Sequence, residues 1–428
     1  MTDAKRKSLP LLCAAACFAL CCGAAWFSVR AGLSRLLTET APALRFAGAG
    51  REAARLAEEA AALSPLDPEA RLARALALAA AGDTRGAVGE SERAASLRPG
   101  YYLSWLRLGR AREQAGDAEG AAAAYREAAR LAPAYAEPRW QLGNMLLRGG
   151  RYEEAFAELR RAAASRPALF PYTAELAWRV YGEDARAVAE AVGPSDDAAR
   201  VALARFFARR GKGTEAVEQF RVAGPAAGET ERRELVAELI SVRRFREAYE
   251  VWSEDAGGAG AGGVGSVIDG GFEGRAVAAR QGFGWRFARD AAGVSASLDV
   301  TGPREGARSL LLEFGGAPDA NARLASQLVI VEPGARYRLG FAARAEKLVS
   351  GGPLLVAVVE AGEEGRTLAE SQPLPADTGG WADLAFEFEV PPQSDAVVVV
   401  IRRRPCPAAP CPVFGRAWFD AFSLGRVG

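Results

Sequence analysis

One carboxylate near the end of the chain occupies a position where a side chain could do chemistry. Aromatic residues alternate in strand fashion along RAWFDAFSLG, from Arg416 to Gly425, and Asp420 lies in the middle of this run. An aspartate in such a place is a surface residue, a calcium ligand or part of a sugar site. The sequence contains no histidine, which excludes Ser-His-Asp and Cys-His catalysis and removes most zinc sites.

Two cysteines just before this strand are the second candidate for chemistry. Cys406 and Cys411 lie in PCPAAPCP, far from any other cysteine. Two thiols without histidine cannot complete a tetrahedral zinc site. We therefore predict a local disulfide, which requires an oxidising compartment. The preceding arginines, residues 402–404, are either exposed side chains at a strand end or the mark of an anionic partner surface.

The amino terminus predicts a membrane segment. Residues 1–8 form a short basic leader, and Leu9 to Val29 is uncharged and about as long as a bilayer-spanning helix. The basic leader favours a cytoplasmic amino terminus and an extracytoplasmic bulk. The segment is either a retained anchor or a cleaved signal peptide, because CCGAA supplies small residues for a cleavage site. Residues 30–49 are expected to be a linker.

Composition narrows the class of protein and its location. The net charge of +1 argues against a nucleic-acid binder held by bulk electrostatics. Heavy use of Ala, Gly and Arg suggests a GC-rich bacterial genome. The predicted location is the bacterial inner membrane, with a single pass through the lipid bilayer at residues 9–29 and most of the chain in the periplasm.

A 34-residue period runs through the first half of the chain. One unit reads YLSWLRLGRAREQAGDAEGAAAAYREAARLAP, and its landmarks recur at the same spacing toward both ends, closing on prolines 65, 99, 133 and 167. The unit resembles the tetratricopeptide repeat on these residues: Trp105, Leu108, Gly109, Ala121, Tyr125, Ala128 and Pro133. The resemblance implies stacked helical hairpins, so we expect an α-solenoid of five to six hairpins over residues 50–255.

The same resemblance implies a peptide-binding groove lined by the first helix of each unit. Five side chains would face this groove and could grip a carboxylate or an extended chain: Arg107, Arg110, Trp140, Asn144 and Arg148. The alternative is a solvated helix face with ordinary arginine content.

A glycine-rich stretch separates the two halves. Residues 256–266 are predicted to be a flexible linker. Gly258, Gly260 and Gly263 spell G-x-G-x-x-G. The dinucleotide fingerprint needs a strand before it and a helix after it, whereas here a helix precedes and strands follow, so we exclude a nucleotide site.

From residue 267 onward the pattern changes to short strands rich in Val, Leu and Phe, which predicts a β-sandwich over residues 267–428. Its landmarks come in the order IDGGFE, GW, GARSLLLEF, QLVIVEPGARYRLGFAARA, GWADLAFEFEV and WFDAFSL. This order resembles the jelly-roll carbohydrate-binding modules of the galactose-binding-like superfamily.

The resemblance implies two kinds of site in the sandwich. Many such modules hold a structural calcium, and Glu273 and Asp420 match its carboxylate ligands, with Asp269 as a further oxygen donor. The alternative for Asp420 is a plain hydrogen-bonded aspartate. Sugar contacts would come from aromatic rings and polar groups, although both tryptophans also suit core packing; the candidates are Trp285, Trp381 and Tyr337, with Asn321, Gln327, Arg336 and Arg344.

The predicted protein is thus multidomain: one transmembrane helix, an α-solenoid and an all-β jelly-roll sandwich. We expect a non-catalytic scaffold of the bacterial cell envelope that binds proteins through its repeats and a glycan through its sandwich, in exopolysaccharide or surface-polymer assembly. The alternative is a protein-interaction scaffold whose sandwich is structural or protein-binding. An enzyme with paired carboxylates is disfavoured, because no acidic pair stands out on adjacent strand ends. No cofactor is predicted apart from structural calcium.

Overall fold

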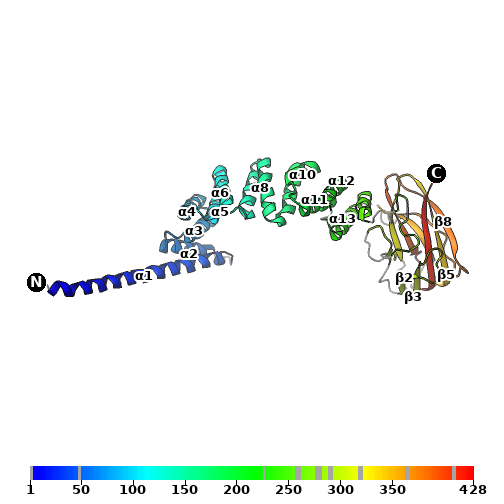
Figure 1. Ribbon diagram of the computed structural model, residues 1–428, viewed down its shortest axis with the longest axis horizontal. Coiled ribbons are helices and arrows are strands. Elements are labelled where there is room, and N and C mark those ends of the chain that lie inside the picture. The colour runs from blue at the N-terminus through cyan, green and yellow to red at the C-terminus, as the bar shows by residue number, and fades with distance from the viewer. Residues whose placement is uncertain are drawn as a thin grey trace. The chain divides into compact units, whose positions relative to one another are not determined.

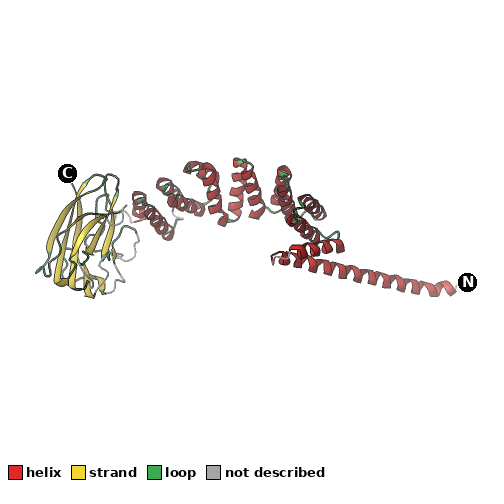
Figure 2. Ribbon diagram, turned by 180° about the vertical axis from the view of Figure 1, so that it is seen from behind, coloured by secondary structure: helices red, strands yellow, loops and turns green. Residues whose placement is uncertain are grey.

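The computed structural model describes residues 3–46, 50–224, 227–255, 262–274, 282–287, 293–316, 322–361, 366–406 and 411–428. Of the predicted glycine-rich linker, residues 256–261 lie outside this range, and so do the sugar candidate Asn321 and the PAAP segment between the two cysteines. The chain divides into two compact units, Met1–Gly193 and Pro194–Gly428. Helices fill the first unit, and helices followed by strands make up the second (Figures 1 and 2).

The helices form consecutive antiparallel pairs that follow the predicted period. Helices α2, α4, α6 and α8 begin 34 residues apart, and so do α3, α5 and α7. The first unit contains α1 (Asp3–Phe46), α2 (Gly50–Leu63), α3 (Pro68–Ala80), α4 (Thr84–Leu97), α5 (Tyr102–Gln114), α6 (Ala118–Leu131), α7 (Ala136–Arg148), α8 (Tyr152–Ser165), the 3₁₀ turn η1 (Pro167–Leu169), α9 (Phe170–Tyr181) and α10 (Ala185–Val192). The second continues with α11 (Asp197–Arg209), α12 (Gly213–Ala223), α13 (Glu229–Ser241) and α14 (Phe245–Asp255).

The Gly-Asp dipeptides explain why the hairpins turn where they do. Gly116 has φ +83°, a left-handed conformation that ends a helix at little cost only for glycine. The next residue, Asp117, caps α6 because its carboxylate accepts the N–H of Gly120 at 2.9 Å. Gly82 and Asp83 make the same turn one repeat earlier.

The first repeat takes its first helix from α1. Stepping back one period from α3 reaches residues 34–46, which are the end of α1. There Ser34 Oγ donates to Ala60 O at 3.0 Å, and Leu37 packs against the alanines of α2 and α3. The prediction of a linker over residues 30–49 is therefore wrong. Residues 30–46 belong to α1, and Arg30, Ser34 and Leu37 contact α2 and α3 as the first helix of a later pair contacts its partners.

Residues 16–29 of α1 are uncharged, and nearly all of them are exposed. Phe18, Trp26, Phe27 and Val29 are 62–72% exposed, and contact with α2 begins at Arg30, whose Nη2 donates to Leu63 O at 2.9 Å. Within the described residues, the stretch Ala16–Thr40 is long and apolar enough to cross a membrane. A signal sequence would meet the same criterion.

The strands of the second unit form two five-stranded sheets that pack face to face. Every strand pair in them is antiparallel. One sheet, here called sheet A, has the order β1-β4-β9-β6-β7, and the other, sheet B, has the order β2-β3-β10-β5-β8. The strands are β1 (Arg286–Phe287), β2 (Val294–Asp299), β3 (Ser309–Gly316), β4 (Ala325–Ile330), β5 (Arg336–Ser350), β6 (Leu354–Glu360), β7 (Thr367–Glu370), β8 (Ala382–Glu389), β9 (Ala396–Arg403) and β10 (Val413–Val427).

A single apolar core lies between the two sheets. Alternate residues of β5 and β10 point into it, so that Phe341 stacks on Phe422 with ring centroids 5.3 Å apart. Before the first strand, Phe283 is fully buried against Tyr249 and Trp252 of α14. The last helical pair and the sandwich therefore share an aromatic contact. The expected fold class, an α-solenoid followed by an all-β sandwich after an N-terminal apolar helix, is confirmed.

Candidate functional site

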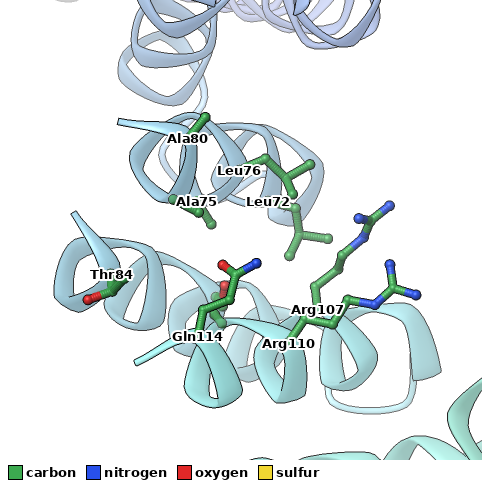
Figure 3. A pocket seen from close by; sticks show the side chains of 11 residues that line it. Leu72, Ala75, Leu76, Ala80, Thr84, Arg107, Arg110 and Gln114 are labelled. Atoms are coloured by element: carbon green, nitrogen blue, oxygen red, sulfur yellow. The ribbon is translucent and has the colours of Figure 1, made fainter. Parts of the chain in front are cut away.

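A pocket of about 490 Å³ opens between α3, α4 and α5 of the solenoid. Its wall on α3 is apolar, formed by Leu72, Ala75 and Leu76, whereas α5 contributes Arg107 and Arg110. Figure 3 shows the two guanidinium groups side by side, close to Leu72 at one end of the pocket. The pocket therefore combines an apolar wall with two arginine side chains.

The other predicted groove residues lie one repeat further along, on α7, and do not line this pocket. Asn144 Nδ2 donates to Trp140 O of its own helix at 2.8 Å, and Arg148 pairs with Glu113 of α5. Arg110 itself pairs with Glu137 of α7. The structure thus brings together two of the five predicted residues, Arg107 and Arg110.

In the sandwich, aromatic and cationic side chains form a row across the outward face of sheet B. Arg344 of β5 lies over the ring of Trp418 of β10, with its Cζ 4.0 Å from the ring centroid, and 5.6 Å from the ring of Trp381. Trp418 is buried, and Trp381 is half-buried. Arg344 Nε is buried and lies 3.9 Å from Glu346 Oε1, beyond hydrogen-bond distance. This row, Trp381–Arg344–Trp418, combines one half-buried ring with a guanidinium stacked on a buried ring.

The β2–β3 loop fixes the orientation of both indoles. Asp299 accepts Trp418 Nε1–H at 2.7 Å and the N–H of Thr301 at 2.8 Å. These hydrogen bonds, the one from Trp418 first, lower the pKa of Asp299. Gly302 O accepts Trp381 Nε1–H at 3.0 Å. The rings are therefore held in place without a ligand, which reduces the entropic cost of binding one.

Asp420 is fully buried and holds the same loop. Its Oδ2 accepts the N–H groups of Arg304 at 2.8 Å and Glu305 at 3.1 Å, and its Oδ1 accepts that of Ala421 at 2.7 Å. Burial raises the pKa of Asp420, and the charge of nearby Glu273 raises it further, while the three N–H groups act in the opposite direction. Asp420 is thus a structural acceptor, neither exposed nor part of the outward row.

The other two predicted metal ligands also accept backbone hydrogen bonds. Glu273 Oε1 takes the N–H groups of Ala307 and Arg308 at 2.6 and 2.9 Å. The N–H of Gly274 donates to both oxygens of Asp269, at 3.0 Å to Oδ1 and 3.1 Å to Oδ2. The N–H of Glu273 also donates to Oδ1. No three carboxylate or thiol groups of the described residues converge on one point. A calcium ion would have Glu273 and Asp420 as its carboxylate ligands, completed by carbonyls and water.

Two of the three predicted sugar-binding aromatics are core residues, so that prediction is wrong for them. Trp285 is 2% exposed and packs between Phe272 and Phe422, at 5.2 and 4.9 Å between ring centroids. Tyr337 is 2% exposed and stacks on Phe388. Tyr337 faces inward because its position on β5 points toward the core, and Trp285, which precedes β1, donates its Nε1–H to Asp269 O at 3.2 Å. Gln327 is buried, and its side-chain amide forms two hydrogen bonds with the backbone of Ile268. Arg336 is exposed on β5.

The cysteine pair is joined by a disulfide, with Cα atoms 5.7 Å apart. The arginines before it are not three exposed side chains. Arg402 and Arg404 both bind Glu370 of β7, at 2.6 and 2.9 Å, whereas Arg403 is buried. Alternation along β9 accounts for the difference, because successive side chains point to opposite faces of the sheet.

Sequence reasoning missed Trp418 and Asp299. Trp418 belongs to the quoted stretch RAWFDAFSLG, but only its register opposite Arg344 on β5 places it in the outward row. Asp299 is the last residue of β2, and Trp418, which donates a hydrogen bond to it, lies 119 residues later in the sequence. Alternation along WFD would have placed Trp418 and Asp420 on one face of the strand.

Comparison with protein-family models finds two matches. Residues 105–169 match a tetratricopeptide repeat, and residues 264–408 match a carbohydrate binding domain. The chain therefore combines tetratricopeptide repeats with a domain of carbohydrate-binding type, as the sequence predicted. The second match ends before β10, the strand that carries Trp418 and Asp420.

Among solved structures, the helical region is similar to several tetratricopeptide proteins. MamA from Desulfovibrio magneticus RS-1 is 24% identical, over 37% of this chain and 90% of that chain, with a TM-score of 0.33. TTC0263, a thermophilic protein of Thermus thermophilus, is 20% identical over 48% of this chain and 99% of that chain, with a TM-score of 0.29. The first repeat domain of Spaghetti (RPAP3), bound to an HSP90 peptide, is 21% identical over 28% of this chain and 98% of that chain, with a TM-score of 0.27. No curated protein matches the sequence.

Proposed function

We propose that this protein is a membrane-anchored, non-catalytic scaffold of the bacterial cell envelope. Its solenoid binds acidic peptide segments of partner proteins, and the outward face of its sandwich binds a glycan, in exopolysaccharide or surface-polymer assembly. The observation that carries the proposal is the pairing of a preformed pocket lined by Arg107 and Arg110 with a carbohydrate-binding-type domain in one chain.

The geometry of α1 supports a retained anchor over a cleaved signal peptide. Its 44 residues span about 66 Å at 1.5 Å per residue, roughly twice the hydrocarbon thickness of a bilayer. The exposed apolar part extends to Val29, and contact with α2 starts at Arg30. We therefore place residues 9–29 in the bilayer. The rest of α1 joins the first repeat directly to the membrane, with the repeats and the sandwich in the periplasm.

The peptide pocket is tested by charge removal at its rim. We expect Arg107→Gln to weaken binding of acidic, aliphatic-containing peptides roughly ten-fold, because a charge-assisted hydrogen bond contributes about 1.5–3 kcal/mol. The measurement is fluorescence anisotropy with the peptides that the wild-type chain selects from an array. Arg130→Gln is the matched control, because Arg130 is exposed on α6 and pairs with Glu127. Equal affinity of wild type and Arg107→Gln would contradict a peptide site at this pocket.

Glycan binding is assigned to the Trp381–Arg344–Trp418 row. Trp381 offers a half-buried ring to the apolar face of a sugar. Arg344 is stacked on Trp418, with its buried Nε 3.9 Å from Glu346 Oε1, and Arg416 extends the polar surface from β10, with its guanidinium 5.4 Å from the Trp418 ring centroid. The arrangement supplies the ring and hydrogen-bond donors that a pyranose requires.

A structural calcium ion belongs to the same proposal. Glu273 and Asp420 are carboxylates of like charge that hold the β2–β3 loop from two sides, and a cation between them would offset their repulsion. We expect calcium to raise the melting temperature of the sandwich and a chelator to lower it, since an ion bound only to the folded state stabilises that state. Calorimetry of the wild type and Asp420→Ala, each with calcium, magnesium or chelator, measures this effect. An unchanged wild-type melting temperature would refute the calcium site.

The competing function is a scaffold whose sandwich contacts only protein. The aromatic contact between Phe283 and α14 favours it, because this contact gives the sandwich a structural role as the cover of the last repeat. The two functions differ in whether the outward face of sheet B retains a glycan.

A further inference from the structure

The disulfide between Cys406 and Cys411 lies against a buried arginine. Arg403 is 2% exposed. Its Nη2 lies 2.7 Å from Cys411 Sγ, 2.9 Å from Cys411 O and 3.9 Å from Cys406 Sγ. One guanidinium group therefore touches the sulfur of Cys411 directly and reaches that of Cys406.

Among the residues that the structure describes, no carboxylate pairs with the guanidinium of Arg403. Its described acceptors are the carbonyls of Gly352 and Cys411 and the two sulfurs, and its buried Nη1 has no acceptor among the residues that the structure describes. Residues 407–410 are Pro-Ala-Ala-Pro, without an ionisable side chain. Burial lowers the pKa of Arg403, because a low-dielectric site disfavours the charged form. An anion that formed next to Arg403 would be strongly stabilised.

The structural value of the bridge is small. The two cysteines are only five residues apart, and closing so short a loop contributes roughly 2 kcal/mol by the chain-entropy estimate. This stabilisation alone does not explain why the buried guanidinium of Arg403 contacts Cys411 Sγ. Reduction of the bridge creates the missing anion, a thiolate, at this place.

We infer that Cys406–Cys411 is a redox-active disulfide whose reaction partner is a protein or small-molecule dithiol. Cys406 is the sulfur that is attacked, and Cys411 leaves as a thiolate held by Arg403. Cys406 is half-buried. A Cβ at Gly351 would lie 3.0 Å from Cys406 Sγ, so the absence of a side chain at Gly351 leaves this sulfur accessible.

The exchange balances as follows. A thiolate of the partner bonds to Cys406 Sγ, and the bond between Cys406 and Cys411 breaks with its electron pair on Cys411. The second thiol of the partner loses its proton to solvent and attacks the mixed disulfide, which releases Cys406 as a thiolate that takes up a proton. The partner leaves as a disulfide, oxidised by two electrons, and the Cys406–Cys411 pair is reduced by two.

The test is the thiol–disulfide equilibrium of the full chain in mixtures of reduced and oxidised dithiothreitol. Acid quenching, alkylation and fragment mass spectrometry separate Cys406 and Cys411 from the cysteines of α1. At a pH above the thiol pKa of both proteins, we expect Arg403→Met to shift the equilibrium toward the disulfide roughly ten-fold for each unit by which the thiol pKa rises. Arg403→Lys should recover part of the shift, and Arg402→Met should behave as wild type. Identical equilibria in wild type and Arg403→Met would overturn the inference.

A second measurement needs no variant and covers the case in which Arg403→Met does not fold. The alkylation rate of Cys411 in the reduced wild-type chain is followed against pH with iodoacetamide. The inference predicts an apparent thiol pKa at least one unit below the ordinary value of about 8.5. A value at or above the ordinary one would overturn it.

Discussion

Replacing Asp420 by alanine is expected to lower the free energy of unfolding of the sandwich by about 3–5 kcal/mol. Asp420 is fully buried and accepts three backbone N–H groups, two of them from the β2–β3 loop. The alanine variant leaves these donors without an acceptor, and an unsatisfied buried donor costs about 1–3 kcal/mol. For a domain of this size the melting temperature should fall by about 10 °C.

Calorimetry of the full chain with chelator present measures this loss apart from any effect of calcium. Asp383→Ala is the matched control, because Asp383 is 71% exposed and contacts the same loop through Arg304. An exposed ion pair contributes at most about 1 kcal/mol. Equal losses in the two variants would show that the buried hydrogen bonds of Asp420 do not hold the loop.

Replacing Gly109 by valine is expected to disrupt the α5–α6 pair and to destabilise the solenoid by about 3 kcal/mol, at the upper end of the cost of overpacking. A Cβ at Gly109 would lie 2.6 Å from two ring carbons of Tyr125. Tyr125 is fully buried and donates its hydroxyl to Glu113 at 2.8 Å. Its ring therefore cannot move aside without losing its hydrogen bond and its packing.

Thermal denaturation followed by circular dichroism at the helical minimum measures the effect of Gly109→Val. Gly89 on α4 provides the control, because a Cβ there meets nothing within 4 Å. Gly89→Ala should raise stability by up to about 1 kcal/mol, since alanine restricts the unfolded chain and favours helix. A Gly109→Val variant as stable as Gly89→Ala would contradict the close helix contact.

The helical half was largely predictable because its information is local. The repeats at residues 68–165 carry a proline, a glycine-containing turn and small residues at the helix contact at the same spacing, so a 34-residue period specifies most of their helix positions. The first helix of the first repeat escaped prediction because it continues the helix of the apolar segment without a break. Only the contacts of Arg30, Ser34 and Leu37 with α2 and α3 reveal its second role.

The sandwich was predictable as a class, but its site was not. Trp285 and Trp381 both follow a glycine in the sequence, yet one is in the core and the other faces outward. Trp285 packs on Phe422, far along the chain, whereas the indole of Trp381 donates to Gly302 O of the β2–β3 loop, which is itself held by Asp420. The same loop explains why Asp420, on an outward-pointing position beside Ala342, is nevertheless fully buried.

The two modules gain a common purpose from their attachment. Under the proposed function, a peptide held by Arg107 and Arg110 and a glycan held at Trp381 would be bound to one chain. Such linkage raises the effective concentration of one ligand near the other without new contacts. This is the physical advantage that a scaffold for envelope polymers would draw from having both sites in one chain.

The central claim, that the outward face of sheet B is a glycan-binding face, is tested most directly by a glycan array. The detergent-solubilised full chain is applied as wild type, as Trp381→Ala and as Val349→Ala, a control at an exposed position of β5. We predict that the wild type and Val349→Ala retain the same group of glycans and that Trp381→Ala binds them about ten-fold more weakly, through loss of the stacking ring. Failure of the wild type to retain any glycan, or equal retention by Trp381→Ala, would contradict the account.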